Sequence, residues 1–107
     1  MRTDVFRFTF DPAVDMLEVE ATLQLAIVAA EGLFGEARTR MDAAYFVDAP
    51  RATMLVDGNT AVGNAVIRIF TTFATHEFGA DAFSIRRVTT AHDRGKSAPA
   101  SPVEAAA

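Results

Sequence analysis

Residues 5–34 read VFRFTFDPAVDMLEVEATLQLAIVAAEGLF, and this stretch contains the two strongest secondary-structure signals of the chain. Its first six residues alternate strictly, which is typical of a β-strand with one buried side. The buried side would carry Phe6, Phe8 and Phe10. The opposite side would carry Val5, Arg7 and Thr9. The stretch therefore predicts a strand over residues 5–10 whose phenylalanines face the core.

A long helix is expected directly after this strand, over residues 11–34. Asp11-Pro12 provides an N-cap followed by proline at the first helical position, where a proline is tolerated. Asp15, with Glu18 three residues later, offers a competing start four residues further on. Gly35 is expected to end the helix in a left-handed conformation.

This helix carries two apolar stripes, whereas a helix packed on one sheet needs only one. The first stripe, expected in the core, consists of Met16, Val19, Leu23, Ile27, Ala30 and Phe34. The second stripe consists of Leu17, Ala21, Leu25 and Val28. Because one small core does not easily cover both, the second stripe predicts an interface, most simply with another copy of the chain.

The rest of the chain completes the order strand, helix, strand, strand, helix, strand. The remaining elements are expected as strands over residues 37–47, 52–57 and 82–88, and as a helix that follows the turn at residues 57–60 and runs to about Phe78. The second and third strands would form an antiparallel hairpin. The core positions of the second helix would be Val62, Val66, Ile69, Phe70 and Phe73.

This order is the split βαβ pattern of ferredoxin-like folds. We therefore expect an α+β, ferredoxin-like βαββαβ two-layer sandwich, with a four-stranded antiparallel sheet and two helices on one face. The single domain would span residues 1–89, and residues 90–107 have the composition of a flexible Ala/Pro-rich tail. Hydrophobic residues make up 50% of the chain, which suffices for one core. A domain this small has a thin stability margin, and association would improve it.

Composition excludes or disfavours several classes of protein. The chain contains no cysteine, which excludes disulfides, thiolate metal ligands and cysteine nucleophiles. Its N-terminal residues lack the pattern of a signal peptide. The longest apolar run, residues 25–30, is far shorter than the ~20 residues of a membrane span. We expect a cytoplasmic protein with no membrane segment, no cofactor and no metal site.

The net charge of −4 disfavours a general nucleic-acid binder, but the charges are unevenly distributed. Residues 11–36 contain six acidic residues and neither Lys nor Arg. Four arginines would lie on the open face of the predicted sheet: Arg7, Arg38, Arg40 and Arg86. They suggest a single-strand RNA or another anionic ligand, although Phe46 is the only aromatic residue expected there for a base to stack on. Solvated arginines, or protein contact such as the stacking of two sheets, are the alternatives.

Few groups in the chain suit acid-base chemistry. His76 and Glu77 lie near the end of the second predicted helix, with Asp81 shortly after it, and Asp57 lies at a strand-to-helix turn. A histidine in the last turn of a helix is favoured by the helix dipole, and Asp57 or Asn59 is more simply a cap. A small ferredoxin-like enzyme that uses His76 or Asp57 as a base in an enclosed pocket is one alternative function.

The leading expectation is a non-enzymatic homo-oligomer or protein-interaction module. Its interface would be the second stripe of the first helix. The partner would be a second copy of the chain or a heterologous protein.

Overall fold

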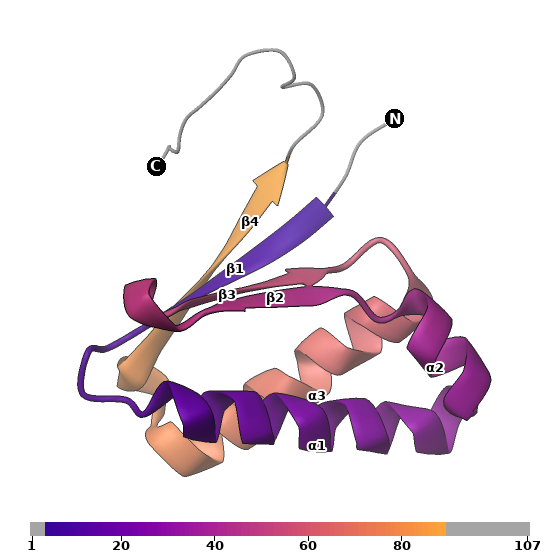
Figure 1. Cartoon of the computed structure of the whole chain (residues 1–107), viewed down its shortest axis with the longest axis horizontal. Helices are drawn as coiled ribbons and strands as arrows, with labels where there is room; N and C mark the ends of the chain where they lie inside the picture. The colour runs from indigo at the N-terminus through magenta and orange to yellow at the C-terminus, as the bar shows by residue number, and fades with distance from the viewer. Residues whose placement is uncertain (1–3, 90–107) are drawn as a thin grey trace.

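The computed structural model describes residues 4–89, which form a small α+β domain (Figure 1). The helices and strands, in chain order, are β1 (Asp4–Phe10), α1 (Met16–Phe34), α2 (Glu36–Asp42), β2 (Tyr45–Asp48), β3 (Thr53–Asp57), α3 (Ala61–Phe78) and β4 (Phe83–Thr89). Two 3₁₀ turns, η1 (Ala49–Arg51) and η2 (Ala80–Ala82), precede β3 and β4. The tail predicted over residues 90–107 lies outside the described residues, as do residues 1–3 of the predicted domain.

The four strands form one antiparallel sheet in the order β2-β3-β1-β4. β1 lies inside the sheet and pairs with β3 on one side and β4 on the other. α1 and α3 lie together on one face of the sheet (Figure 1). We call the opposite face, which no helix of residues 4–89 covers, the open face. The predicted antiparallel sheet and the hairpin of its second and third strands are confirmed.

Among residues 4–89, no helix combines the length and the apolar character needed to cross a membrane. The cytoplasmic location expected from the sequence stays a prediction.

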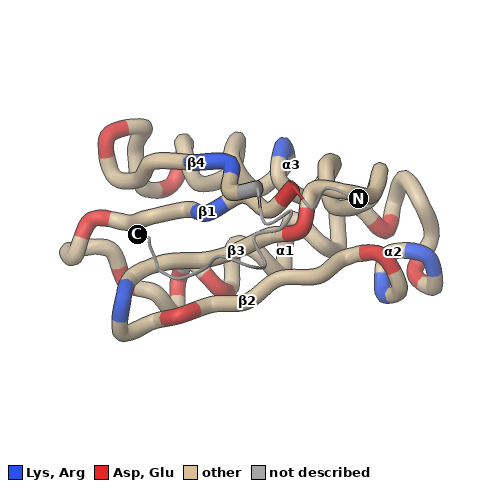
Figure 2. Tube along the Cα trace, turned by 90° about the horizontal axis from the view of Figure 1, so that it is seen from above, with Lys and Arg blue, Asp and Glu red and all other residues tan. Residues whose placement is uncertain are grey.

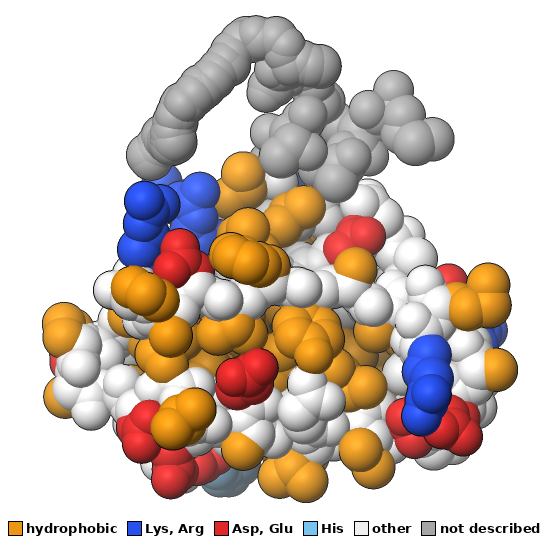
Figure 3. All heavy atoms as spheres, viewed as in Figure 1, with side chains coloured by type: hydrophobic (Ala, Val, Ile, Leu, Met, Phe, Trp, Pro, Cys, Tyr) orange, Lys and Arg blue, Asp and Glu red, His pale blue; other side chains and the backbone are white. Residues whose placement is uncertain are grey.

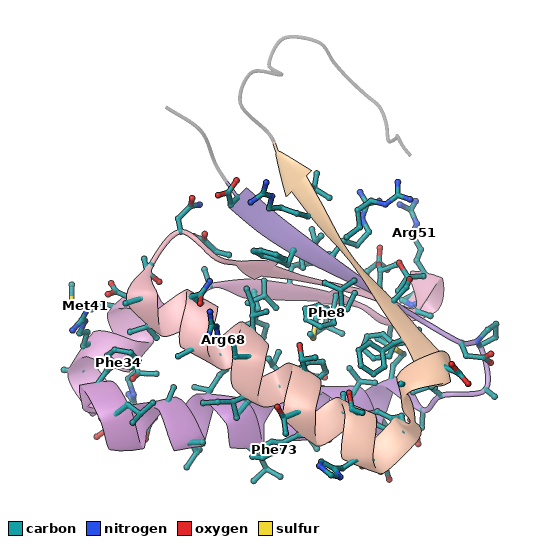
Figure 4. All side chains as sticks on the ribbon, turned by 180° about the vertical axis from the view of Figure 1, so that it is seen from behind. Phe8, Phe34, Met41, Arg51, Arg68 and Phe73 are labelled. Carbon is teal, nitrogen blue, oxygen red and sulfur yellow. The ribbon has the colours of Figure 1, made fainter. Side chains whose placement is uncertain are left out.

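The core lies between the sheet and the two helices and is centred on Phe8, Phe10 and Phe70. Phe8 is fully buried and lies between the sheet and the helices (Figure 4). Its ring meets Phe70 edge-on, with 5.1 Å between the centroids. Phe10 approaches Phe70 in the same way at 6.3 Å. The buried apolar residues of α1 are Val19, Leu23, Ala26 and Ala30. The predicted inward face of β1 is therefore confirmed, and so is the first stripe, whose other members are partly buried against this core.

α1 begins at Met16, so the predicted start at Asp11 is wrong and the competing start at Asp15 is correct. The side chain of Asp15 accepts a hydrogen bond from the backbone N–H of Leu17 at 2.9 Å. Asp11 instead closes a separate turn, because its side chain accepts the N–H of Ala13 and its carbonyl accepts the N–H of Val14. Gly35 ends α1, as expected, and its positive φ of 87° favours glycine, but its ψ of 156° differs from the predicted left-handed helical conformation.

The strand predicted over residues 37–47 is largely wrong, because residues 36–42 form the helix α2 and β2 begins only at Tyr45. The polar residues that alternate in this segment are also spaced for a helix. Glu36 pairs with Arg40 at 2.7 Å and Arg38 with Asp42 at 3.6 Å, both four residues apart. Such pairs stabilise a helix surface, and the segment has few large apolar residues to bury in a sheet.

Phe73, which was expected in the core, and Ile85 are partly exposed. Phe73 is 37% exposed, and α3 instead buries Ile67 and Ala74, which lie closer to the face that packs on the sheet. Ile85 lies on the helix-facing side of β4, opposite Phe8, but it is 41% exposed. β4 is an edge strand, so its helix-facing side chains have neighbours on fewer sides.

Gly63 lets the first turn of α3 approach the end of β3. It is buried, and an added Cβ atom would overlap with the backbone carbonyl oxygen of Asp57. A backbone carbonyl does not rotate away as the end of a side chain would. Gly32 in α1 is the opposite case, because a Cβ atom added there would meet nothing within 4 Å.

We expect Gly63→Ala to lower the free energy of unfolding by about 2 kcal/mol, because the new methyl group forces α3 away from β3. Gly32→Ala should raise it by about 0.5–1 kcal/mol, because alanine loses less backbone entropy than glycine in a helix. Urea unfolding followed by circular dichroism measures both. Equal effects of the two substitutions would contradict this account of Gly63.

Candidate functional site

The second stripe of α1 lies on the surface of the helix layer. Leu17 is 77% exposed, Leu25 61% and Val28 59%, and Ala21 is exposed as well. Hydrophobic side chains appear along α1 in the space-filling view (Figure 3). The sequence thus correctly separated the buried side of this helix from the exposed one. That the exposed stripe is an interface stays a prediction.

α3 extends this apolar surface. Phe73 lies on the side of α3 that points away from the sheet (Figure 4). It lines a surface hollow of about 450 Å³ together with Thr22, Leu25, His76 and Glu77. We call Leu17, Ala21, Leu25, Val28 and Phe73 together the helix-layer patch. The sequence missed the contribution of Phe73 because its spacing also fits the core side of α3.

The open face carries a different set of side chains. One row crosses all four strands, because Phe46 pairs with Leu55, Leu55 with Arg7, and Arg7 with Arg86. Cross-strand partners point to the same side of a sheet. Figure 2 shows basic residues of β1 and β4 side by side. The hollow beside this row measures about 430 Å³ and is lined by Arg7, Thr9, Phe46, Asp48, Arg51, Thr53 and Leu55.

Only two of the four arginines predicted on the open face lie there. Arg7 and Arg86 are cross-strand partners on β1 and β4. Arg38 and Arg40 belong to α2, where each forms an ion pair with a carboxylate of the same helix. The predicted four-arginine surface is therefore wrong, because residues 36–42 are helical. Arg51, at the end of η1, lines the hollow instead.

A carboxyl pair joins the start of α1 to the end of α3. The hydrogen bond between Glu18 and Glu77 raises the pKa of Glu18, and repulsion by Glu77, burial and repulsion by Asp15 act in the same direction. The hydroxyl of Thr22 donates to Oε1 of Glu77 at 2.5 Å. The adjoining hollow is lined by Asp11, Ala13, Val14, Asp15, Glu18, Glu77, Phe78, Asp81 and Ala82. No group of three or more His, Asp or Glu side chains within residues 4–89 is arranged to hold a metal ion.

His76 and Asp57, the two candidate bases, lie at opposite ends of α3 and do not form one site. His76 is exposed in the last turn and borders the hollow beside Phe73. The carboxylate of Asp57 accepts hydrogen bonds from the backbone N–H and the side-chain amide of Asn59, so it stabilises a turn. Thr60 caps α3 by accepting the N–H of Gly63 at 2.9 Å, in place of the expected Asp57 or Asn59.

Comparison with known proteins assigns no function. No protein-family model matches this chain, and no curated protein and no solved structure does. Within residues 4–89, the helix-layer patch and the open face are the two exposed surfaces that could bind a partner or ligand.

We expect Glu18→Gln to raise the melting temperature at pH 7 but not at about pH 3.5. Because the pKa of Glu18 is raised in the folded chain, the folded chain holds this proton to a higher pH than the unfolded chain. The resulting stabilisation is fully present below the unfolded pKa and is lost as the pH rises through the folded pKa. Glutamine keeps a donor for Glu77 at every pH.

Thermal melts at the two pH values measure this difference. Glu20→Gln is the control, since it removes the same charge from an exposed position of α1 that has no side-chain hydrogen bond within residues 4–89. A gain of equal size at both pH values would show that the carboxyl pair does not titrate as described.

Proposed function

We propose that this chain is a non-enzymatic protein that works by self-association through the helix-layer patch. The observation that carries the proposal is the exposure of Leu17, Leu25 and Val28, each more than half exposed on a single helix. Scattered exposed leucines are ordinary on protein surfaces, whereas a contiguous apolar strip is typical of an interaction site.

The fold that we infer for this function is the ferredoxin-like βαββαβ sandwich. The order of the six main elements and the strand order β2-β3-β1-β4 support it. α2 is then an addition between α1 and β2. In this arrangement the two long helices form one layer, and the layer's outer surface is available to a partner.

The size of the surface supports a second copy as the partner. α1 contains 19 residues and is therefore about 28 Å long. Two helices that pack side by side have axes about 8–10 Å apart, so the layer offers several hundred Å². A stable interface buries about 800 Å² on each partner. The helix-layer patch, together with the polar residues around it, is large enough to bury an area close to this value.

The charges of α1 favour an antiparallel packing of the two copies. Asp15, Glu18 and Glu20 lie at the N-terminal end, only Glu31 lies in the second half, and residues 11–36 contain no Lys or Arg. An antiparallel arrangement sets the acidic end of one helix against the less charged end of the other. A twofold axis would then pass near the middle of α1.

We expect the wild-type chain to be a dimer or a larger oligomer and the double variant Leu17→Glu/Leu25→Glu to be a monomer. Two charges in the centre of an apolar interface lose their hydration without a partner, so association becomes unfavourable. The measurement is the molar mass by light scattering after size-exclusion chromatography. Leu25→Lys repeats the test without adding a carboxylate near Glu77.

Phe46→Glu is the matched control. Phe46 is 60% exposed against 61% for Leu25, but it lies on the open face, so its substitution should leave the mass unchanged. A monomeric wild-type chain at high concentration would overturn the proposal. So would a double variant that keeps the wild-type mass, or a Phe46→Glu variant that alone becomes monomeric.

A further inference from the structure

The open face brings two arginines and an apolar surface into one row. Arg86, Arg7, Leu55 and Phe46 follow one another across β4, β1, β3 and β2. Arg7 and Arg86 are directly opposite each other, and like charges in that position destabilise a sheet. An anion bound between the two guanidinium groups would offset this repulsion and stabilise the sheet.

Four of the other arginines within residues 4–89 have a partner in the chain. Arg38, Arg40 and Arg51 form ion pairs with Asp42, Glu36 and Asp48, and Arg68 donates to Asn64. Within residues 4–89, Arg7, Arg86 and Arg87 have neither an ion pair nor a side-chain hydrogen bond, and of these three only Arg7 and Arg86 lie on the open face. A guanidinium group binds phosphate or carboxylate with two parallel hydrogen bonds, so two opposed groups suit an anion with several oxygens.

Hydroxyl groups adjoin the arginine row. The next row on the same face consists of Asp48, Thr53, Thr9 and Ser84. Thr9 and Thr53 also line the hollow that contains Arg7. Hydroxyls donate to phosphate oxygens without adding charge. This row strengthens the case for a phosphate.

The two acidic residues near the arginine row, Asp48 and Asp57, already have partners within the chain. Asp48 lines the hollow but lies 3.8 Å from Arg51, which offsets its charge. Asp57 lies in the row on the other side, beside Val5, and its carboxylate accepts hydrogen bonds from Asn59. Neither carboxylate is paired with Arg7 or Arg86.

The other end of the row suits a planar ring. Phe46 is 60% exposed, and Leu55 lies beside it. Phe46 and Arg7 are two strands apart, which corresponds to about 10 Å, and they line the same hollow. An exposed phenylalanine stacks on a nucleobase, and the stacking depends little on which base it is. A ring on Phe46 and a phosphate on Arg7 can therefore belong to one ligand.

We infer that the open face binds a nucleotide, with the ring on Phe46 and Leu55 and the phosphate between Arg7 and Arg86. The nucleotide is free or is a unit of a single-stranded nucleic acid, since both present this chemistry. The site is independent of the proposed self-association, because it uses the opposite layer of the molecule. Salt screens the attraction between the two guanidinium groups and the phosphate, so binding should be strongest at low salt even though the net charge of the chain is −4.

The test is titration of the full chain with AMP, ribose 5-phosphate, inorganic phosphate and an eight-residue oligoadenylate at about 20 mM salt, followed by NMR. AMP should bind about tenfold more tightly than ribose 5-phosphate, because only AMP carries a nucleobase that can stack on Phe46. Tighter binding of the oligomer, with a steep salt dependence, would identify nucleic acid as the source of the ligand. Equal affinity would identify the free nucleotide.

Three substitutions locate the site. Arg86→Gln and Phe46→Ala should each weaken AMP binding about tenfold. Arg87→Gln is the matched control, since Arg87 is exposed on the same strand but pairs with Phe6 on the helix-facing side, and it should bind AMP as the wild type does. All three positions are exposed or on an edge strand, and thermal melts verify the fold.

Three results would overturn the inference. The first is no binding of AMP or the oligomer at millimolar concentration. The second is an equal loss in Arg86→Gln and Arg87→Gln, which would mean that only the overall charge matters. The third is equal affinity for AMP and inorganic phosphate, which would leave Phe46 without a role. The variant Leu17→Glu/Leu25→Glu should still bind AMP, which separates this site from the helix-layer patch.

Discussion

The packing of Phe8 and Phe10 against Phe70 holds the two layers of this protein together. β1 carries two of these rings and pairs with β3 and β4, so it connects three strands of the sheet directly to α3. Edge-on aromatic contacts bury a large area in a fixed geometry. In a domain this small, few other buried side chains are large enough to replace them.

A two-layer arrangement leaves two outer surfaces, and their chemistry differs. The outer surface of the helix layer is apolar with acidic residues around it, while the open face combines opposed arginines, hydroxyls and a phenylalanine. One side of each layer is buried in the core, and its other side is exposed and accessible to a partner. The two surfaces lie back to back, so a partner on one does not block the other.

Residues 36–42 illustrate how local charges decide a structure with consequences for function. The alternation in this segment fits a strand, but two ion pairs at four-residue spacing fit a helix equally well. With α2 formed, Arg38 and Arg40 leave the sheet and are neutralised within their own helix. The open face then has a single pair of opposed arginines in place of the predicted four-arginine surface.

The sequence by itself determined the inward face of β1, the two stripes of α1, the hairpin of β2 and β3 and the end of α1 at Gly35. These features depend on periodicity and on glycine geometry, which act within a few neighbouring residues. Only the tertiary structure decided the start of α1, the helix at residues 36–42, the exposure of Phe73 and the opposition of Arg7 to Arg86. Competing local signals were balanced at the start of α1 and at residues 36–42, whereas the exposure of Phe73 and the opposition of the two arginines depend on contacts between residues distant in the chain. Arg7 and Arg86 are 79 positions apart, and no local pattern records the register that makes them neighbours.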